Sequence, residues 1–318
     1  SMLKVIGWLV GLLLLVALIV LGGGCYLTEV ALRPRFERNE AACLKAWGEN
    51  YPAHQAWAEE LYRTEKLQEQ ILIASDGTRL HAYCLPAEQP SHRTAVVVHG
   101  YTDHPFGMLH IARLYREALG CNVVLPTLRF HGKSDGDSMG MGWRDRLDVK
   151  RWIEEIPTLF GEGQQVVVHG LSMGAATVMM LSGESDLPAS VRCIVEDCGY
   201  TSVWDQFEKE LNEDYHLPSF PILHVARWVT KLRFGWDFGE ASSLEAVRRS
   251  TVPMLFIHGG NDHYVPTRMV YPLHEAKTQG AKALWIAPDA GHADAYMDHP
   301  EAYTEQVVAF CEAHLATE

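Results

Sequence analysis

Residues 166–180 decide the fold, and they read VVVHGLSMGAATVMM. A run of valines leads into Gly170, and a helix-forming run leads out of Gly174. This pattern predicts a buried strand, a sharp turn and a helix. The two glycines leave room for a turn that holds Ser172 in a strained conformation, with its hydroxyl exposed at the start of the helix. We therefore predict that Ser172 is a nucleophile; the structural alternative is a helix N-cap serine.

The alternation of strand and helix continues on both sides of this stretch. Short apolar runs predict strands at 95–99, 122–126, 165–169, 191–196, 254–258 and 282–287. Helical patterns lie at 108–118, 144–159, 174–184, 267–278 and 301–315. Uninterrupted apolar strands that alternate with helices predict an α/β fold with a mostly parallel, doubly wound sheet. The turn Ser75-Asp76-Gly77, between runs at 70–74 and 78–85, predicts a hairpin at one edge.

A serine hydroxyl is too weakly acidic to attack unaided, so Ser172 needs a base that is held by a carboxylate. In such a sheet the ligand lies beyond the carboxyl ends of the strands, and the chain order is serine, acid, histidine. Asp262 follows the next-to-last predicted strand, and His292 follows the last one. We expect Ser172, Asp262 and His292 to form a catalytic triad, with Asp197 as the main rival for the acid.

The developing negative charge of such a reaction needs two backbone N–H groups, which together form an oxyanion hole. One should come from Met173, the residue after the nucleophile. The other should come from the loop after the strand 95–99, where Tyr101 is the expected donor. This chemistry requires no metal and no organic cofactor.

The composition excludes several classes of protein. The chain has 318 residues, 47% hydrophobic and 21% charged, and its mean hydropathy is −0.08; these values fit neither a disordered chain nor a polytopic membrane protein. The net charge of −13, without a basic run, disfavours nucleic acid as a partner. The seven cysteines are odd in number and include no Cys-x-x-Cys, so we expect neither a disulfide framework nor a zinc ribbon.

The average hydropathy hides an apolar N-terminal segment. From Val5 to Leu27 the chain carries no charge over 23 residues. A helix of that length spans roughly 35 Å, enough for a bilayer core of about 30 Å. We expect residues 1–29 to be a retained single-pass membrane anchor, and the rival interpretation is a cleaved signal peptide.

The side of the membrane that holds the catalytic domain stays open. Arg33, Arg35 and Arg38 after the segment outnumber Lys4 before it, which favours a cytoplasmic domain under the positive-inside rule. A short N-terminus that stays inside is nevertheless a common arrangement.

Two further segments complete the predicted organisation. Residues 30–69 are predicted to form one or two amphipathic helices, which act as a stalk or a packing segment before a hydrolase domain at 70–318.

The segment at 200–250, between two predicted strands, is far longer than a plain crossover connection. They are rich in aromatic residues: Trp204, Phe207, Tyr215, Phe220, Trp228, Phe234, Trp236 and Phe238. We predict a helical lid over the C-terminal edge of the sheet; the alternative is an excursion that packs on itself.

These motifs together resemble the α/β-hydrolase fold superfamily over residues 70–318. The matching stretches are GLSMG at 170–174, ND-x-x-VP at 261–266, GH at 291–292 and RFHGKS at 129–134. The last is similar to the family's R-G-H-G-x-S loop, with Phe130 where glycine is usual. The stretch GWRD at 142–145 then begins a helix, as in bacterial, membrane-anchored members related to acyl esterases. The resemblance implies hydrolysis of an ester or amide through an acyl-enzyme.

We therefore expect a serine hydrolase of the carboxylesterase or lipase kind. The aromatic lid favours apolar short- to medium-chain or lipid-derived acyl esters as substrates, and the expected partners are that substrate and the membrane. Two alternatives stay open: a prolyl-oligopeptidase-like serine peptidase and a non-catalytic, membrane-tethered binding module. The oligomeric state is not predicted.

Overall fold

An eight-stranded sheet forms the centre of the computed structural model, which describes residues 1–317. Its strands are β1 (Gln68–Ile73), β2 (Arg79–Leu85), β3 (Arg93–Val98), β4 (Asn122–Thr127), β5 (Gln165–Leu171), β6 (Val191–Asp197), β7 (Met254–Gly259) and β8 (Lys282–Ala287). They lie in the order β1-β2-β4-β3-β5-β6-β7-β8. Only the β1–β2 and β2–β4 pairs are antiparallel. The predicted mostly parallel sheet with an edge hairpin is confirmed.

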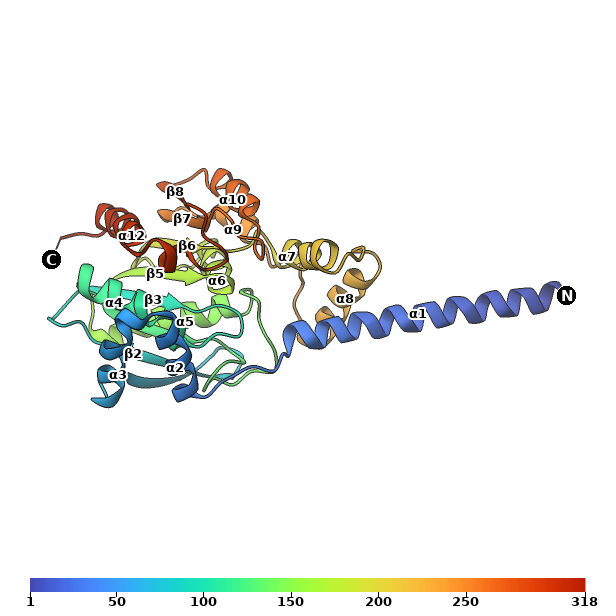
Figure 1. The fold of residues 1–318 in the computed structure, drawn as a ribbon, viewed down its shortest axis with the longest axis horizontal. Coiled ribbons are helices and arrows are strands. Elements are labelled where there is room, and N and C mark those ends of the chain that lie inside the picture. Colours follow the sequence, from blue (N-terminus) through green and yellow to red (C-terminus); the bar gives the residue numbers. More distant parts are fainter. Residues whose placement is uncertain (318) are drawn as a thin grey trace.

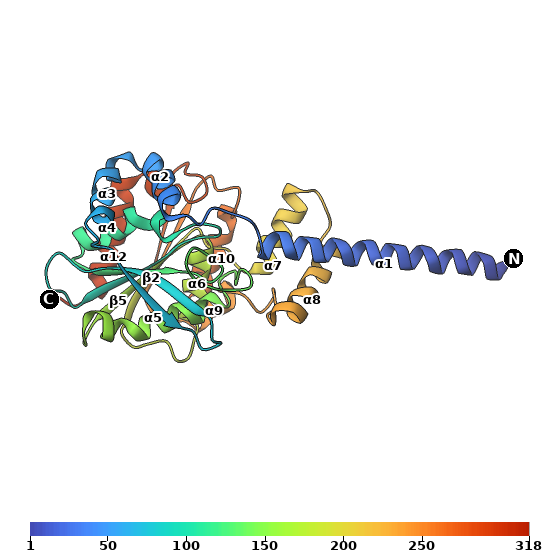
Figure 2. The ribbon, with the colours of Figure 1, turned by 90° about the horizontal axis from the view of Figure 1, so that it is seen from below.

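Helices cover both faces of this sheet (Figure 2). One face carries α2 (Glu40–Asn50), α3 (Gln55–Arg63), α4 (Leu109–Ala118) and α12 (Pro300–His314). The other face carries α5 (Asp145–Phe160), α6 (Met173–Ser182), α9 (Ser243–Arg249) and α10 (Val270–Ala276). Short helical turns lie at Pro52–His54, Pro105–Met108, Thr267–Met269 and Ala295–Asp298 (α11).

The two-residue repeat of a strand distributes the core between these faces. Along β3, Val96 and Val98 pack with α5 and α6, whereas Ala95 and Val97 pack with α4 and α12. Because both sides are buried, the central strands have apolar runs, such as 95–98 in β3 and 166–168 in β5, as the sequence predicts for parallel strands.

The N-terminal segment forms one helix, α1 (Met2–Leu32), which projects from the body (Figure 1). Its most apolar part has a mean hydropathy of 2.9, so its length and composition suit a membrane span. The helix continues beyond the expected boundary at residue 29. Its last turns, with Gly24, Thr28 and Leu32, are buried against the rest of the protein.

The insertion between β6 and β7 is helical, as predicted, and it divides into two parts. The first consists of α7 (Val203–Lys209), a π-helical turn (Glu210–Asp214) and α8 (Ile222–Phe234), which flank the base of α1 (Figure 1). The second part, α9, packs against α6, where a Cβ atom on Gly183 would approach the Ala246 Cα to 2.8 Å. We use the name lid for the first part, α7–α8, whereas α9 belongs to the body.

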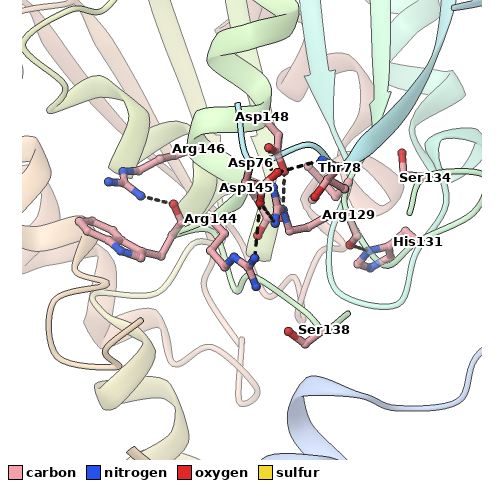
Figure 3. A network of polar contacts seen from close by, with 12 residues as sticks. Asp76, Thr78, Arg129, His131, Ser134, Ser138, Arg144, Asp145, Arg146 and Asp148 are labelled. Carbon is pink, nitrogen blue, oxygen red and sulfur yellow. Dashed lines mark hydrogen bonds and ion pairs between the residues drawn. The ribbon is translucent and has the colours of Figure 1, made fainter. Parts of the chain in front are cut away.

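A buried polar network holds the loop between β4 and α5 (Figure 3). The Arg129 guanidinium donates to both carboxylate oxygens of Asp148, at 2.6 and 2.8 Å, and to Asp76 Oδ2 at 2.9 Å. Asp145, next to this cluster, accepts the backbone N–H of Gly142 at 2.8 Å. Burial raises the pKa of both Asp145 and Asp148, and the positive charge of Arg129 opposes that shift. Arg129 is thus the cation that allows these carboxylates to be buried.

We expect Arg129→Met to lower the free energy of unfolding by about 3–5 kcal/mol, because it leaves buried carboxylates unpaired. Chemical denaturation of the detergent-solubilised full chain, followed by circular dichroism, measures this. The control is Arg151→Met, which removes the i,i+4 pair with Glu155 on the surface of α5 and should cost at most about 1 kcal/mol. Equal losses in the two variants would contradict the structural role of Arg129.

Candidate active site

Ser172 lies at the turn between β5 and α6, in a backbone conformation that L-residues rarely adopt. Its φ is 57° and its ψ is −114°. A Cβ atom on Gly170 would lie 2.1 Å from the Gly174 carbonyl oxygen, and one on Gly174 would lie 2.3 Å from that of Val98. Only glycine fits at both positions, so the two glycines permit the strained turn that the sequence predicts around Ser172.

Ser172, His292 and Asp262 form a continuous chain of hydrogen bonds. The Ser172 Oγ lies 2.9 Å from His292 Nε2, and His292 Nδ1 lies 2.8 Å from Asp262 Oδ2. His292 comes from the loop after β8 and Asp262 from the turn after β7. The structure thus brings together the three side chains that chain order and strand ends singled out.

The Asp262 carboxylate is buried and held by several donors. Its Oδ1 accepts the backbone N–H groups of Tyr264 and Val265, both at 3.0 Å. Burial alone would raise its pKa, but hydrogen bonds from His258 and His292 outweigh burial and lower the pKa of Asp262 to about 2. Asp262 is therefore a carboxylate at neutral pH, able to hold His292 with a proton on Nδ1.

The rival acid and the other strand-end histidines have different partners. Asp197 accepts the Tyr303 hydroxyl at 2.8 Å. His169 lies between the Tyr115 and Tyr303 hydroxyls, at 2.8 and 2.9 Å, as a core histidine with both nitrogens paired. His258, which the sequence also indicates as a core residue, lies 3.4 Å from Asp262 Oδ2. The sequence did not predict this contact between His258 and Asp262, although the two residues are only four positions apart at the end of β7.

The two expected oxyanion donors face no competing acceptor. Within residues 1–317, the backbone N–H groups of Tyr101 and Met173 have no protein hydrogen-bond partner. The next residue, Thr102, donates its N–H to His131 Nε2 at 3.1 Å, while His131 Nδ1 lies 2.9 Å from the Arg129 carbonyl oxygen. Burial lowers the pKa of His131, so it stays neutral and can accept that N–H. The loop at 129–134 thereby holds the Tyr101–Thr102 segment.

Phe130, where glycine is usual in the R-G-H-G-x-S loop, adopts φ 69°. This explains why glycine suits the position. Phe130 is instead packed against Arg38. The Arg38 guanidinium lies 4.8 Å from the centre of the Phe130 ring, and Arg38 Nη2 donates to the Phe130 carbonyl oxygen at 2.8 Å. The segment after α1 thus stabilises the strained residue.

An apolar cavity of about 520 Å³ contains Ser172. This volume lies in the range of small-molecule sites. Residues of the body that line it include Tyr101, Met141, Met173 and Tyr200, and the lid supplies Phe207, Leu211, Leu217 and Ile222. The last turns of α1 supply Gly23, Tyr26, Leu27, Val30 and Ala31. The sequence did not predict that α1 lines the cavity, although the spacing of these residues places them on one face of a helix.

One cluster in the described residues has distances compatible with a metal ion, namely Cys198, Asp262 and His292. The chemistry of these three side chains does not favour a metal ion. His292 has both ring nitrogens engaged, by Asp262 and by Ser172. Burial raises the pKa of the Cys198 thiol well above its usual value, so the thiolate that a metal needs is disfavoured. His292 and Asp262 therefore fit a hydrogen-bonded chain with Ser172 better than a set of metal ligands.

Comparison with known proteins agrees with this fold. The family profile described as “Alpha/beta hydrolase family” matches residues 95–306. The uncharacterized protein YqkD of Bacillus subtilis is 30% identical over 225 residues, which are 71% of this chain and 72% of that protein. The alpha/beta hydrolase domain-containing protein WAV2 of Arabidopsis thaliana is 24% identical over 311 residues, 92% of each chain.

Among solved structures, the Pyrococcus furiosus esterase Pf2001 superimposes with a TM-score of 0.64 at 21% identity, over 79% of this chain and 92% of that one. The chain belongs to the α/β hydrolase family.

A buried carboxyl next to the site makes stability depend on pH. Burial raises the pKa of Glu196 to about 8, from 4.5 for an exposed glutamate. Between these values the folded state holds a proton that the unfolded state releases, so the free energy of unfolding falls as the pH rises. In Glu196→Gln that loss should disappear. Between about pH 5 and about pH 8, the free energy of unfolding of this variant should rise by about 1–3 kcal/mol relative to that of the wild type.

Urea denaturation at the two pH values measures this difference. Glu154→Gln, on the exposed side of α5, is the control and should follow the wild type. A Glu196→Gln variant with the pH dependence of the wild type would contradict the assignment.

Proposed function

We propose that this protein is a serine hydrolase that cleaves carboxylic esters through an acyl-enzyme intermediate, tethered to a membrane by α1. The observation that carries the proposal is the hydrogen-bonded chain Ser172–His292–Asp262 at the wall of an apolar cavity. The strained φ of Ser172 supports it, since such strain is typical of a nucleophile on a strand-to-helix turn.

In the first half of the reaction, the Ser172 oxygen attacks the ester carbonyl carbon while His292 Nε2 takes the hydroxyl proton. The backbone N–H groups of Met173 and Tyr101 stabilise the oxyanion, assisted by the positive end of the α6 dipole. Asp262 stabilises the imidazolium that forms. When the carbonyl is restored, His292 gives its proton to the leaving alkoxide, and the alcohol departs.

In the second half, a water molecule attacks the acyl-enzyme. His292 takes the proton of this water, the oxyanion forms again between the same N–H groups, and the proton then returns to Ser172. The carboxylic acid leaves, and the starting state is regenerated. No other side chain has to change protonation.

The cavity favours an apolar acyl group as the substrate. Its lining is mostly aliphatic and aromatic, and the few polar groups are Gln206, Glu210 and tyrosine hydroxyls. The Pf2001 structure, which is titled an esterase, agrees with ester substrates.

The nucleophile is tested with a fluorophosphonate probe. We expect the wild type to be labelled and to hydrolyse nitrophenyl esters, and Ser172→Ala to lose both activities. The control, Ser138→Ala, changes a buried serine in the β4–α5 loop that does not line the cavity and should retain labelling. An unlabelled, folded wild type would support the binding-module alternative. Turnover of aminoacyl anilides without ester turnover would support the peptidase.

The acid is tested by Asp262→Asn. An amide in this position no longer selects the tautomer of His292 with its proton on Nδ1, so kcat for nitrophenyl esters should fall by roughly 10³–10⁴-fold, with little change in KM. Asp289→Asn, exposed in the loop before His292, is the control and should retain wild-type kcat. A tenfold or smaller loss in Asp262→Asn would argue for a different acid, such as Asp197.

A further inference from the structure

The last turns of α1 form one wall of the catalytic cavity. The lining residues Gly23, Tyr26, Leu27, Val30 and Ala31 follow the pattern i, i+3, i+4, i+7, i+8, so they share one helix face. This stripe extends for roughly 12 Å along the helix axis. The same helix continues outward as the apolar segment with membrane-spanning length. One continuous helix therefore contributes both the candidate anchor and the wall of the site.

Close packing against α8 holds this part of α1. A Cβ atom on Gly24 would lie 2.3 Å from Val225 Cγ1, so the two helices approach at a position that only glycine allows. Thr28 Oγ1 lies 2.9 Å from the Gly24 carbonyl oxygen and 3.4 Å from that of Ala226, on α8. Such contacts between small residues are typical of helix pairs that pack backbone to backbone.

The C-terminal end of α1 is bonded to the catalytic body. The last carbonyl groups of a helix lack partners within it. Here the Tyr101 hydroxyl donates to the Ala31 carbonyl at 2.6 Å, and the backbone N–H of Met139 donates to that of Leu32 at 2.7 Å. Tyr101 also carries the proposed oxyanion donor. The wall of the cavity and the oxyanion loop are thus joined by one hydrogen bond.

The mouth of the cavity lies between α1 and the lid. Of the lining residues, Tyr26, Tyr215 and Val30 are the most exposed apolar side chains, with 73%, 70% and 50% of their surface accessible, followed by Leu217 and Tyr264 with 44% each. They mark the side where the cavity opens, whereas Ser172 is buried. The last turns of α1 and α8 of the lid lie side by side (Figure 1).

The lid helix that packs against α1 also exposes apolar side chains. Phe220, Trp228 and Leu232 are exposed by 71%, 55% and 68%, on or next to α8. Tryptophan and other aromatic residues beside a spanning helix are typical of the membrane interface. A bilayer around the outer part of α1 would meet the lid and the mouth of the cavity at the same level.

From this continuity we infer that the substrate is a long-chain acyl ester of a membrane lipid, which enters laterally from the bilayer along the α1 stripe. The last turns of α1 then determine acyl-length specificity, so α1 is part of the substrate site as well as a tether. This inference rests on the proposed esterase function and adds to it the source of the substrate and the residues that select its length.

The test uses the full chain reconstituted in phosphatidylcholine vesicles. The long-chain probe is methylumbelliferyl oleate dissolved in the bilayer, the short-chain probe is methylumbelliferyl acetate, and fluorophosphonate labelling reports the nucleophile. Leu27→Trp fills the cavity from the α1 wall. The matched control is Cys25→Trp, on the same helix at an exposed position that does not line the cavity.

We expect Leu27→Trp to lower oleate turnover at least tenfold, while acetate turnover and labelling stay within about twofold of the wild type. Cys25→Trp should leave all three unchanged. Equal losses for oleate and acetate, or no loss for oleate in a labelled variant, would overturn the inference. A wild type without labelling or acetate turnover would instead overturn the proposed function, so the two failures are distinguishable.

A second pair of variants tests the position of the wall. Gly24→Val should separate α1 from α8 and lower oleate turnover relative to acetate turnover. Gly22→Val should not, because a Cβ atom on Gly22 meets no atom within 4 Å. Identical oleate-to-acetate ratios in these two variants would contradict the inference. So would efficient turnover of a water-soluble S-acylated peptide by a wild type that leaves the bilayer ester intact.

Discussion

The turn at Ser172 is the constraint on which the rest of the site depends. Gly170 and Gly174 touch main-chain atoms at distances that admit no side chain, and Ser172 between them has a positive φ. Such a conformation costs on the order of 1–3 kcal/mol and persists only where its surroundings fix it. The paired strands β3, β5 and β6 and the buried helix α6 supply that rigidity. The strain at the nucleophile is therefore maintained by the centre of the sheet.

The remaining parts of the site are held by polar contacts that are buried or partly buried. Asp262 is fixed by backbone donors and two histidines, and the loop that carries Tyr101 is held through His131. His131 in turn lies in the loop that Arg129 ties to Asp148 and Asp76 (Figure 3). Removal of the Arg129 cation thus acts on one proposed oxyanion donor, Tyr101, through a short series of contacts.

Much of this arrangement was predictable from the sequence, because it depends on local patterns and on chain order. Apolar β-branched runs identified the parallel strands, and strand ends placed Asp262 and His292 near Ser172. What the sequence did not predict were contacts between segments that lie far apart along the chain. The packing of Gly24 against Val225 and the hydrogen bond from Tyr101 to Ala31 join residues that no periodicity relates. For the same reason, the assignment of α9 to the body rather than to the lid required the three-dimensional structure.

The structure of α1 also bears on how freely its sequence can change. In its outer part, Gly7, Gly11 and Gly22 have open space around them, and the neighbouring apolar side chains are exposed. There, any residue of suitable hydropathy would serve. In its inner part, Gly24, Thr28 and Leu32 are buried, and Tyr26, Leu27, Val30 and Ala31 line the cavity. This single helix therefore contains two segments under different selection: the outer one is free to drift among apolar residues, whereas the inner one must evolve together with α8 and the cavity.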